Sequence, residues 1–366
     1  MPGTIIRNAI CLLMLICTSV AAADDAAPAG LRDYDVTQYV SIKSFSPETV
    51  MYLDNNDEIL MACREGRTRE QLDAAGIDCL DSQLVLLRAW RLLDKQDGVY
   101  TSRLPILGPQ RMTAIRATTR EAAATLLAEL RPDFAGYVGT LAAAGFADNA
   151  FSVLFSYVVD GLVWYQFRQR DRGVSTQVTA EMPLWAGAIW AVYPARASRC
   201  GTNQYTVDNG YISLNWSEAA HEQIGGLTGG SDDLRALAAA VRADGRVVDP
   251  ALRDALLPYR LVAAYGRPLI PVITESATDP LHAGALALSG DLADRSLAVL
   301  PLDDLQAELG LDDPAVALII VYHELMWDLM EMLEADGLVE RPCVLSGDPA
   351  ATPADIGKLA FIVLGE

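Results

Sequence analysis

The chain has 366 residues, of which 51% are hydrophobic and 21% are charged. This apolar content excludes a mainly disordered chain, because disordered segments are poor in hydrophobic residues. The formal net charge of −20 argues against a nucleic-acid-binding protein, since a phosphate backbone must be met by clustered cations. The length allows two or three domains.

The first 23 residues have the layout of a signal peptide. Arg7 is their only charged residue, and it precedes an apolar run over Ala9–Cys17. Ala21–Ala23 supply the small residues of a cleavage site, and Asp24 follows directly. The run is shorter than the roughly 20 apolar residues of a membrane-spanning helix. We therefore expect a signal peptide over 1–23, a periplasmic or secreted protein, and no integral membrane segment after cleavage; an uncleaved anchor is the alternative.

Four cysteines remain after this cleavage, and an even number in an exported chain indicates disulfides. Cys63 and Cys79 are close in sequence and form the first expected pair. Cys200 and Cys343 would then join two distant segments. Four cysteines allow three connectivities, so other pairings remain open. Four free thiols are expected instead if the protein stays in a reducing compartment.

Residues 24–45 are polar and are expected to form a flexible lead-in, followed by a small domain over 46–108. The capping-box pair Thr68 and Gln71 starts a short helix in this domain. The expected elements are a helix over Asp57–Gly66, the short helix from Thr68 through Ala75, a longer helix over Asp78–Lys95 with Leu80, Leu84 and Leu87 on its apolar face, and a strand over Val99–Leu104.

This order of elements resembles the winged helix-turn-helix of bacterial regulators. The residues that carry the resemblance are Cys63–Leu72, Ser82–Leu84 and Trp90–Leu93, and it covers only residues 55–107. In that family the third helix enters the DNA major groove. Here residues 57–107 hold seven basic and nine acidic side chains, so we expect no nucleic-acid partner. A DNA-binding regulator is an alternative only if the N-terminus is not a signal peptide.

Residues 109–366 are expected to form a larger helical domain with short strands. The fold class is therefore α+β and mainly α-helical, with a winged-helix-like N-terminal unit. Pro271 places one strand at the edge of a sheet. A terminal helix followed by two strands predicts a possible second winged-helix-like unit over 312–366. The expected helices are Arg111–Leu130, Asp133–Ala144, Asn149–Arg172, 231–243, 249–258, 279–310 and 312–337, and the expected strands are 183–187, 189–194, 211–216, 269–274, 338–341 and 359–364.

The chain has three histidines, and one of them, His323, lies on the apolar stripe of the terminal helix beside Glu324. A histidine next to carboxylates can bind a metal or act as a general base. The zinc-protease signature needs a second histidine four residues later, where this chain has Trp327. A metal-assisted hydrolase that uses His323, Glu324 and His221 is therefore the alternative function. The competing interpretation is a core histidine that is hydrogen-bonded to its neighbours and lies beside a solvated acidic face that comprises Glu324, Asp328 and Glu331.

No nucleophile elbow, phosphate loop or dinucleotide motif is present, so we expect neither catalysis nor a cofactor. Asp160, in an apolar helix, predicts a hydrogen-bonded core carboxylate. Aromatic residues gather within 183–216 and could line a ligand groove or form the packed face of a small sheet. The candidate ligand-binding residues are Trp185, Trp190, Tyr193 and Trp216. The leading hypothesis is an exported, soluble, non-enzymatic binding or assembly protein of a bacterial-type cell envelope that recognises a protein or a small ligand through this region.

Overall fold

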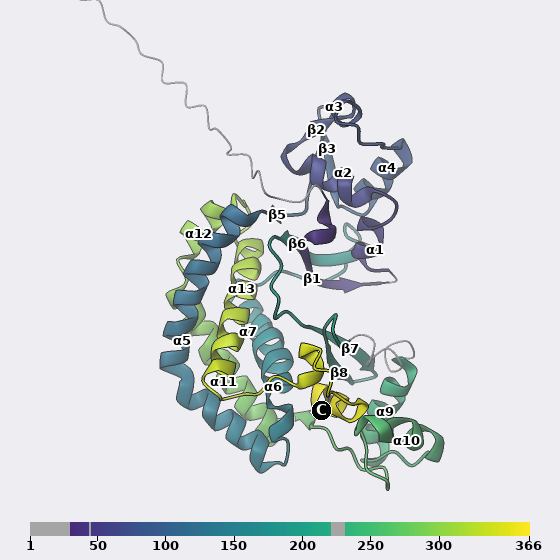
Figure 1. Ribbon diagram of the computed structural model, residues 1–366, viewed down its shortest axis with the longest axis vertical. Coiled ribbons are helices and arrows are strands. Elements are labelled where there is room, and N and C mark those ends of the chain that lie inside the picture. Colours follow the sequence, from purple (N-terminus) through teal and green to yellow (C-terminus); the bar gives the residue numbers. More distant parts are fainter. Residues whose placement is uncertain (1–29, 44, 221–230) are drawn as a thin grey trace, which may run out of the picture.

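The computed structural model describes residues 30–43, 45–220 and 231–366. Within these ranges the chain is an α+β fold dominated by helices, with three small sheets, as predicted. Figure 1 shows a small upper unit, a row of long helices along one side, and a second region of strands and helices below. The expected signal peptide and His221 lie outside the described residues.

The upper unit comprises residues 31–107 together with strand β6 (Trp185–Val192), which lies much later in the sequence. Three of its strands form a sheet in the order β2-β4-β3, around the helices α2, α3 and α4. Its elements follow the order helix, strand, helix, helix, strand, strand, and the winged-helix resemblance stays a prediction. Its elements are η1 (Leu31–Asp33), β1 (Asp35–Ile42), α1 (Pro47–Met51), α2 (Asn56–Ala62), η2 (Cys63–Glu65), β2 (Arg67–Thr68), α3 (Arg69–Ala74), α4 (Asp81–Ala89), β3 (Leu93–Gln96), β4 (Val99–Ser102) and β5 (Ile106–Leu107).

Local capping decides where the helices of this unit begin. The predicted capping box is present, because the Gln71 amide nitrogen donates to Thr68 Oγ1 at 3.3 Å and the Thr68 amide nitrogen donates to Gln71 Oε1 at 2.8 Å. The predicted long helix over 78–95 is wrong at its end. The helix stops at Ala89, Arg91 adopts a left-handed φ of 55°, and β3 then pairs antiparallel with β4.

The predicted flexible lead-in over 24–45 is also wrong for the described part, because β1 is a regular strand. It pairs antiparallel with β6 (Trp185–Val192) along its whole length, from Asp35 opposite Val192 to Ile42 opposite Trp185. This partner lies about 150 residues further along the chain, so no local pattern reveals it. At Gly187, where φ is 132°, a Cβ atom would collide with the Tyr39 carbonyl oxygen, which explains a glycine at this close approach.

The sheet of β1, β6 and β5 separates two hydrophobic cores. Ala188, Trp190 and Val192 of β6 belong to the core of the helical body, whereas Ile189 and Ala191 belong to the core of the upper unit. This is the alternation that a strand buried on both faces produces. The upper unit is thus attached to the body through a shared sheet rather than by a linker, and Ile189 and Ala191 of β6 join the upper core from beyond the expected domain boundary at 108/109.

The helical body is built around α5 and α13, which run side by side in Figure 1. The two predicted helices at 111–130 and 133–144 are one helix that continues through Pro132. The predicted terminal helix is confirmed, with Asp313 as N-cap and Pro314 in the first turn. The helices of the body are α5 (Pro109–Ala143), η3 (Ala147–Asn149), α6 (Ala150–Val153), the π-helix η4 (Leu154–Leu162), α7 (Val163–Gln169), α11 (Pro280–Val299), α12 (Leu302–Leu309) and α13 (Pro314–Ala335).

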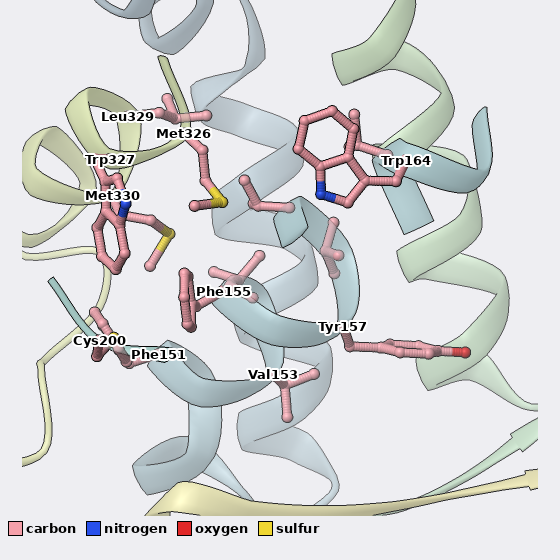
Figure 2. Packing of buried hydrophobic residues seen from close by; sticks show 14 of the residues in the cluster. Phe151, Val153, Phe155, Tyr157, Trp164, Cys200, Met326, Trp327, Leu329 and Met330 are labelled. Carbon is pink, nitrogen blue, oxygen red and sulfur yellow. The ribbon is translucent and has the colours of Figure 1, made fainter. Parts of the chain in front are cut away.

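The π-helix η4 runs through the centre of this core. Phe155 packs against α13, with 5.0 Å between its ring centroid and that of Trp327 (Figure 2), whereas Tyr157 packs against His282 and Phe361. The Tyr322 hydroxyl donates to the Val159 carbonyl at 2.9 Å, which satisfies a backbone group in the widened turn. The run Ala147–Gln169 is long and apolar enough to cross a membrane, and 72% of its most apolar window is buried inside the fold.

The lower region contains the largest sheet, in the order β7-β8-β10-β9. The strand after Pro271 is an edge strand, as predicted. The second winged-helix-like unit over 312–366 is wrong, because 338–341 form no strand and β10 pairs instead with β8 and β9. The remaining elements are β7 (Gly201–Val207), β8 (Gly210–Trp216), α9 (Ser231–Asp244), α10 (Pro250–Leu256), η5 (Leu257–Tyr259), β9 (Val272–Glu275), η6 (Cys343–Ser346), η7 (Pro353–Leu359) and β10 (Ala360–Gly365).

Candidate functional site

Two of the three carboxylates on the acidic face of α13 are buried, contrary to the expected solvated face, and the Glu331 side chain is 33% exposed. Glu324, Asp328 and Glu331 recur at helical spacing, so they lie on one side of the helix. The exposed fractions of Glu324 and Asp328 are only 1% and 2%. A buried carboxylate is costly unless it is paired and hydrogen-bonded, so the partners of this face decide what it can do.

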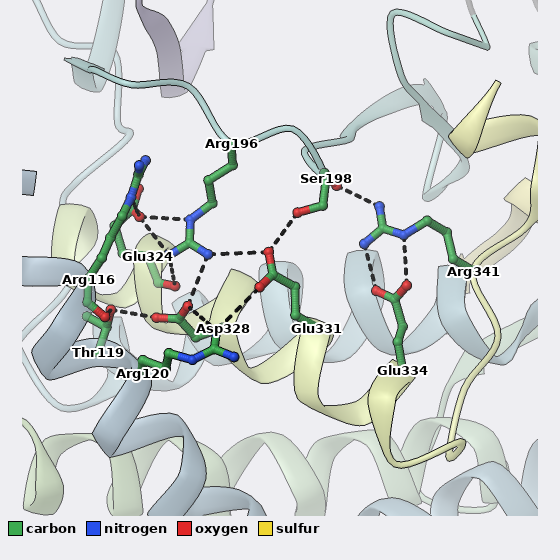
Figure 3. A network of polar contacts seen from close by, with 10 residues as sticks. All are labelled: Arg116, Thr119, Arg120, Arg196, Ser198, Glu324, Asp328, Glu331, Glu334 and Arg341. Atoms are coloured by element: carbon green, nitrogen blue, oxygen red, sulfur yellow. Dashed lines mark hydrogen bonds and ion pairs between the residues drawn. The ribbon is translucent and has the colours of Figure 1, made fainter. Parts of the chain in front are cut away.

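Arginines supply those partners from two directions (Figure 3). Arg116 of α5 donates from Nε to Glu324 Oε2 at 2.7 Å. Arg196, in the connection between β6 and β7, contacts Glu324 Oε2 at 2.9 Å and Asp328 Oδ1 at 3.0 Å. The Arg196 side chain is only 9% exposed, so this pairing takes place largely out of water.

Asp328 and Glu331 also accept hydrogen bonds from hydroxyl groups. Asp328 accepts a hydrogen bond from Thr119 Oγ1 at 2.6 Å. Glu331 accepts from Ser198 Oγ at 2.7 Å, and Arg120 lies 3.7 Å from its other oxygen. No local sequence pattern pointed to Arg196, because the segment that carries it is irregular and its partners lie about 130 residues away.

The electrostatic consequence is clearest at Glu324. Burial alone would raise the pKa of this carboxyl, but the charges of Arg196 and Arg116, together with the Arg116 hydrogen bond, outweigh burial and hold the pKa below its ordinary value. Glu324 is therefore held as a carboxylate whose Oε2 atom accepts from both Arg116 and Arg196. Such a group is poorly suited to accept a proton or to bind a metal.

The segment 193–200, which we call the strap, connects the upper unit to the lower sheet and is held at several points. Arg341 donates to the Ser198 carbonyl at 2.6 Å and also pairs with Glu334 of α13 at 2.6 Å. Arg199 contacts Asp35 of β1 at 2.5 Å and Glu218, after β8, at 2.6 Å. The strap thus ties the upper unit, the helical body and the lower region into one framework.

His323 lies on the adjoining side of α13, between two tryptophans. Its ring is edge-on to Trp190 at 5.3 Å and to Trp327 at 6.2 Å between centroids. The His323 Nδ1 atom is buried without a hydrogen-bond partner among the described residues, as is each of the two indole nitrogens. His323 therefore packs as an aromatic ring, as the core-histidine interpretation expected, although its Nδ1 is not hydrogen-bonded.

Asp160, at the end of the π-helix, accepts a hydrogen bond from Trp164 Nε1 at 3.0 Å, as expected of a core carboxylate. Burial raises the pKa of Asp160, and this effect exceeds the opposing effects of the Trp164 bond and of nearby His323. π-Helical turns are frequent at functional sites, so Asp160 is the carboxyl in this core with the most unusual surroundings.

The histidines of the described chain do not support a metal centre. In the described ranges, no group of three or more His, Cys, Asp or Glu side chains is arranged to hold a metal ion. His282 is engaged elsewhere, with Nδ1 2.6 Å from the Tyr157 hydroxyl. Glu324 is committed to arginines, and His221 lies outside the described residues. The predicted set of His323, Glu324 and His221 stays a prediction, because only its first two members lie within the described residues.

The four predicted ligand-binding aromatic residues do not share a groove. Trp190 is 1% exposed inside the body core, and Trp185 donates from Nε1 to the Trp90 carbonyl at 2.7 Å. Tyr193 packs against Tyr34, with 5.3 Å between ring centroids. Trp216 lies on β8, in a different sheet. A hollow of about 550 Å³ lies beside α7 and the loop after it, and none of these four residues lines it.

The four cysteines of the described residues, Cys63, Cys79, Cys200 and Cys343, are free thiols in the structure. Cys63 and Cys79 are both buried in the core of the upper unit, and burial, with a contribution from Cys79, raises the pKa of Cys63 to about 11. Cys200 and Cys343 lie close to the Arg341–Ser198 contact in sequence. The predicted pairings Cys63–Cys79 and Cys200–Cys343 remain predictions.

The most exposed apolar side chains of the upper unit outside the β1–α1 connection surround α4. Leu80 and Val85 are 60% and 62% exposed, and Leu53 is 48% exposed. The sequence predicts Leu80 on the buried, apolar face of the helix. The helix in fact begins at Asp81, so Leu80 is the N-cap residue and its side chain is not part of the buried stripe.

Comparison with models of known protein families, with curated proteins and with solved structures finds no significant match.

Proposed function

We propose that this chain is an exported, non-enzymatic protein of a bacterial-type cell envelope that binds another protein. The observation that carries this proposal is the position of α4. It lies at the outer edge of the upper unit, away from the long helices (Figure 1), and exposed apolar side chains lie on it (Val85), at its N-cap (Leu80) and on the segment before α2 (Leu53). In a winged helix the corresponding helix is the recognition element, and here its composition is unsuited to DNA.

The surroundings of α13 support binding rather than catalysis. Its buried carboxylates are neutralised by arginines, and its histidine is packed between tryptophans. A general base needs a free lone pair within reach of substrate, and a catalytic metal needs several unpaired ligands. We assign the polar groups of α13 to holding the strap, and through it to fixing the orientation of the upper unit.

A protein partner fits better than a small ligand. Small-molecule sites are typically enclosed and mostly apolar, with a few placed polar groups. The predicted aromatic residues are packed or dispersed, and the hollow beside α7 is lined by polar loop residues such as Ser175, Thr176 and Gln177. Exposed apolar side chains on a rigid element are instead typical of a surface that another protein covers.

The test is isolation of the tagged full-length chain from the organism that encodes it, under mild conditions. Size-exclusion chromatography with light scattering then gives the mass of the assembly. We expect a stoichiometric complex with a different protein and no stoichiometric zinc in metal analysis. A lone monomer that carries bound zinc, and that loses a hydrolase activity in His323→Ala while staying folded, would contradict the proposal and restore the hydrolase alternative.

A further inference from the structure

Three exposed apolar side chains lie on or next to α4: Leu53 on the segment before α2, Leu80 at the N-cap and Val85 within the helix. Leu53 precedes the turn that begins α2, and this turn is bonded to the start of α4: Asn55 donates from Nδ2 to the Asp78 carbonyl at 2.7 Å. The Gln83 amide donates to Asn55 Oδ1 at 2.8 Å, closing the same junction. Leu53 and Leu80 therefore lie on neighbouring segments, and Val85 follows on the next turn of the helix. We call Leu53, Leu80 and Val85 the α4 face.

The α4 face stands on a rigid support. Gln83 is buried and also donates to Asn56 Oδ1 at 3.2 Å, while the Asn56 amide donates to the Val50 carbonyl at 2.8 Å. Leu84 and Leu87, on the opposite side of α4, are buried in the core of the upper unit. The exposed side chains are consequently presented in a fixed geometry, which lowers the entropy cost of binding.

The rim of the α4 face is acidic. Asp54, Asp73, Asp78 and Asp81 are exposed around it. Arg69 contacts both Asp73 at 3.1 Å and Asp81 at 3.3 Å, so one positive charge is shared between two carboxylates. Arg88, at the far end of α4, is the one cation within this helix, and it is exposed.

This charge distribution favours a cationic partner. An anionic lipid surface or a nucleic acid would be repelled by the rim and by the net charge of −20. A second copy of this chain would bring the same acidic rim against itself. We infer that the α4 face binds a partner protein through a cationic amphipathic segment, whose apolar side chains cover Leu53, Leu80 and Val85 while its Lys or Arg side chains meet the aspartates. This inference rests on the proposed function and specifies its surface and partner.

The test uses the full mature chain and a defined probe, a fluorescent helical peptide of leucine and lysine. A peptide of the same pattern with glutamate in place of lysine is the charge control. We expect the lysine peptide to bind, its affinity to fall as salt rises, and the glutamate peptide not to bind. The double variant Leu80→Ser/Val85→Ser should weaken binding about tenfold or more, because buried apolar anchors dominate interface energies.

A matched variant separates this surface from general charge attraction. Val248 and Tyr265 are 57% and 64% exposed on the lower region, so Val248→Ser/Tyr265→Ser removes comparable apolar groups elsewhere. We expect this variant to bind the lysine peptide like the unaltered chain. Equal binding by all three proteins, or equal weakening by both variants, would overturn the inference. If the native complex persists unchanged in Leu80→Ser/Val85→Ser, the α4 assignment fails while the proposed binding function stands.

Discussion

Arg196 is the side chain on which the buried ion pairs of α13 most depend, because it contacts Glu324, Asp328 and Glu331 at once. A buried charge pair contributes little net stability compared with apolar packing, but removal of one partner leaves the other charge buried and unpaired. The contribution of Arg196 to the free energy of unfolding is therefore measured by replacing this residue. Arg103, which pairs with Asp94 on the surface of the upper unit, provides the contrasting case.

Arg196→Gln should lower the free energy of unfolding by about 3 kcal/mol or more, since two carboxylates with side-chain exposures of 2% and 3% lose their shared cation. Arg103→Gln should change it by less than about 1 kcal/mol. Urea denaturation followed by circular dichroism measures both. Similar effects of the two variants would show that the buried network is not held by Arg196.

The stability of the protein should also depend on the ionisation of Glu324. Its pKa is held below the ordinary value of 4.5, so its contribution is present above that pH and is lost as the pH falls through the lower folded value. Glu324→Gln should therefore show a shallower loss of unfolding free energy below about pH 4.5 than the unaltered chain. Parallel curves for the two proteins across that range would contradict the assignment.

At the scale of elements, the local sequence predicts where some helices begin and which strand lies at an edge, but it does not predict which strands pair. The Thr68–Gln71 capping box, the Asp313–Pro314 helix start and the edge position of the strand after Pro271 all follow from residue chemistry that acts over a few positions. β1 is not predicted because its strand partner among the described residues is β6, far along the chain. The final strand was placed correctly, but its neighbours were not.

For the candidate site too, the sequence predicts local features but not the partners that lie far along the chain. The helical spacing of Glu324, Asp328 and Glu331 showed that they share a face, but not that arginines from α5 and the strap would bury it. The pattern of the winged-helix-like unit located α4. Exposure of Leu80 depended on where the helix begins, and a shift of one or two residues at a helix end is the least predictable feature of a sequence.

The π-helix gives the sharpest prediction at this scale. A Cβ at Gly161 would lie 2.8 Å from the Ser156 carbonyl oxygen, inside the widened turn. Gly161→Ala should therefore destabilise the protein by about 1–3 kcal/mol, because the backbone must shift in a packed core. Gly139, in α5, has open space at the same position, so Gly139→Ala should be neutral or stabilising by up to about 1 kcal/mol. Thermal unfolding distinguishes the two, and equal effects would contradict this account of the turn.

At the scale of the whole molecule, the shared β1–β6–β5 sheet and the strap join two cores into one framework. The upper unit is thereby presented at a fixed orientation, with α4 outward. This architecture suits a protein whose role is to hold a binding surface in place, and an exported location would add disulfides to the same framework.

The export hypothesis predicts a mature chain that begins at Asp24 and contains the pairs Cys63–Cys79 and Cys200–Cys343. Peptide mapping by mass spectrometry without reduction, on protein isolated from its own organism, measures both. The two pairs would join residues within the upper-unit core and across the two sides of the Arg341–Ser198 contact. An intact N-terminus with four alkylatable thiols would contradict export and the disulfides together.

Site-specific photo-crosslinking in the living organism tests the central claim most directly. A photoreactive amino acid replaces Val85 on the α4 face in one strain and Val248 on the lower region in another; both side chains are exposed to a similar extent. The account predicts a discrete conjugate with a protein that carries a basic amphipathic segment from position 85, and none from position 248. A conjugate formed only from position 248, or none from position 85, would contradict it.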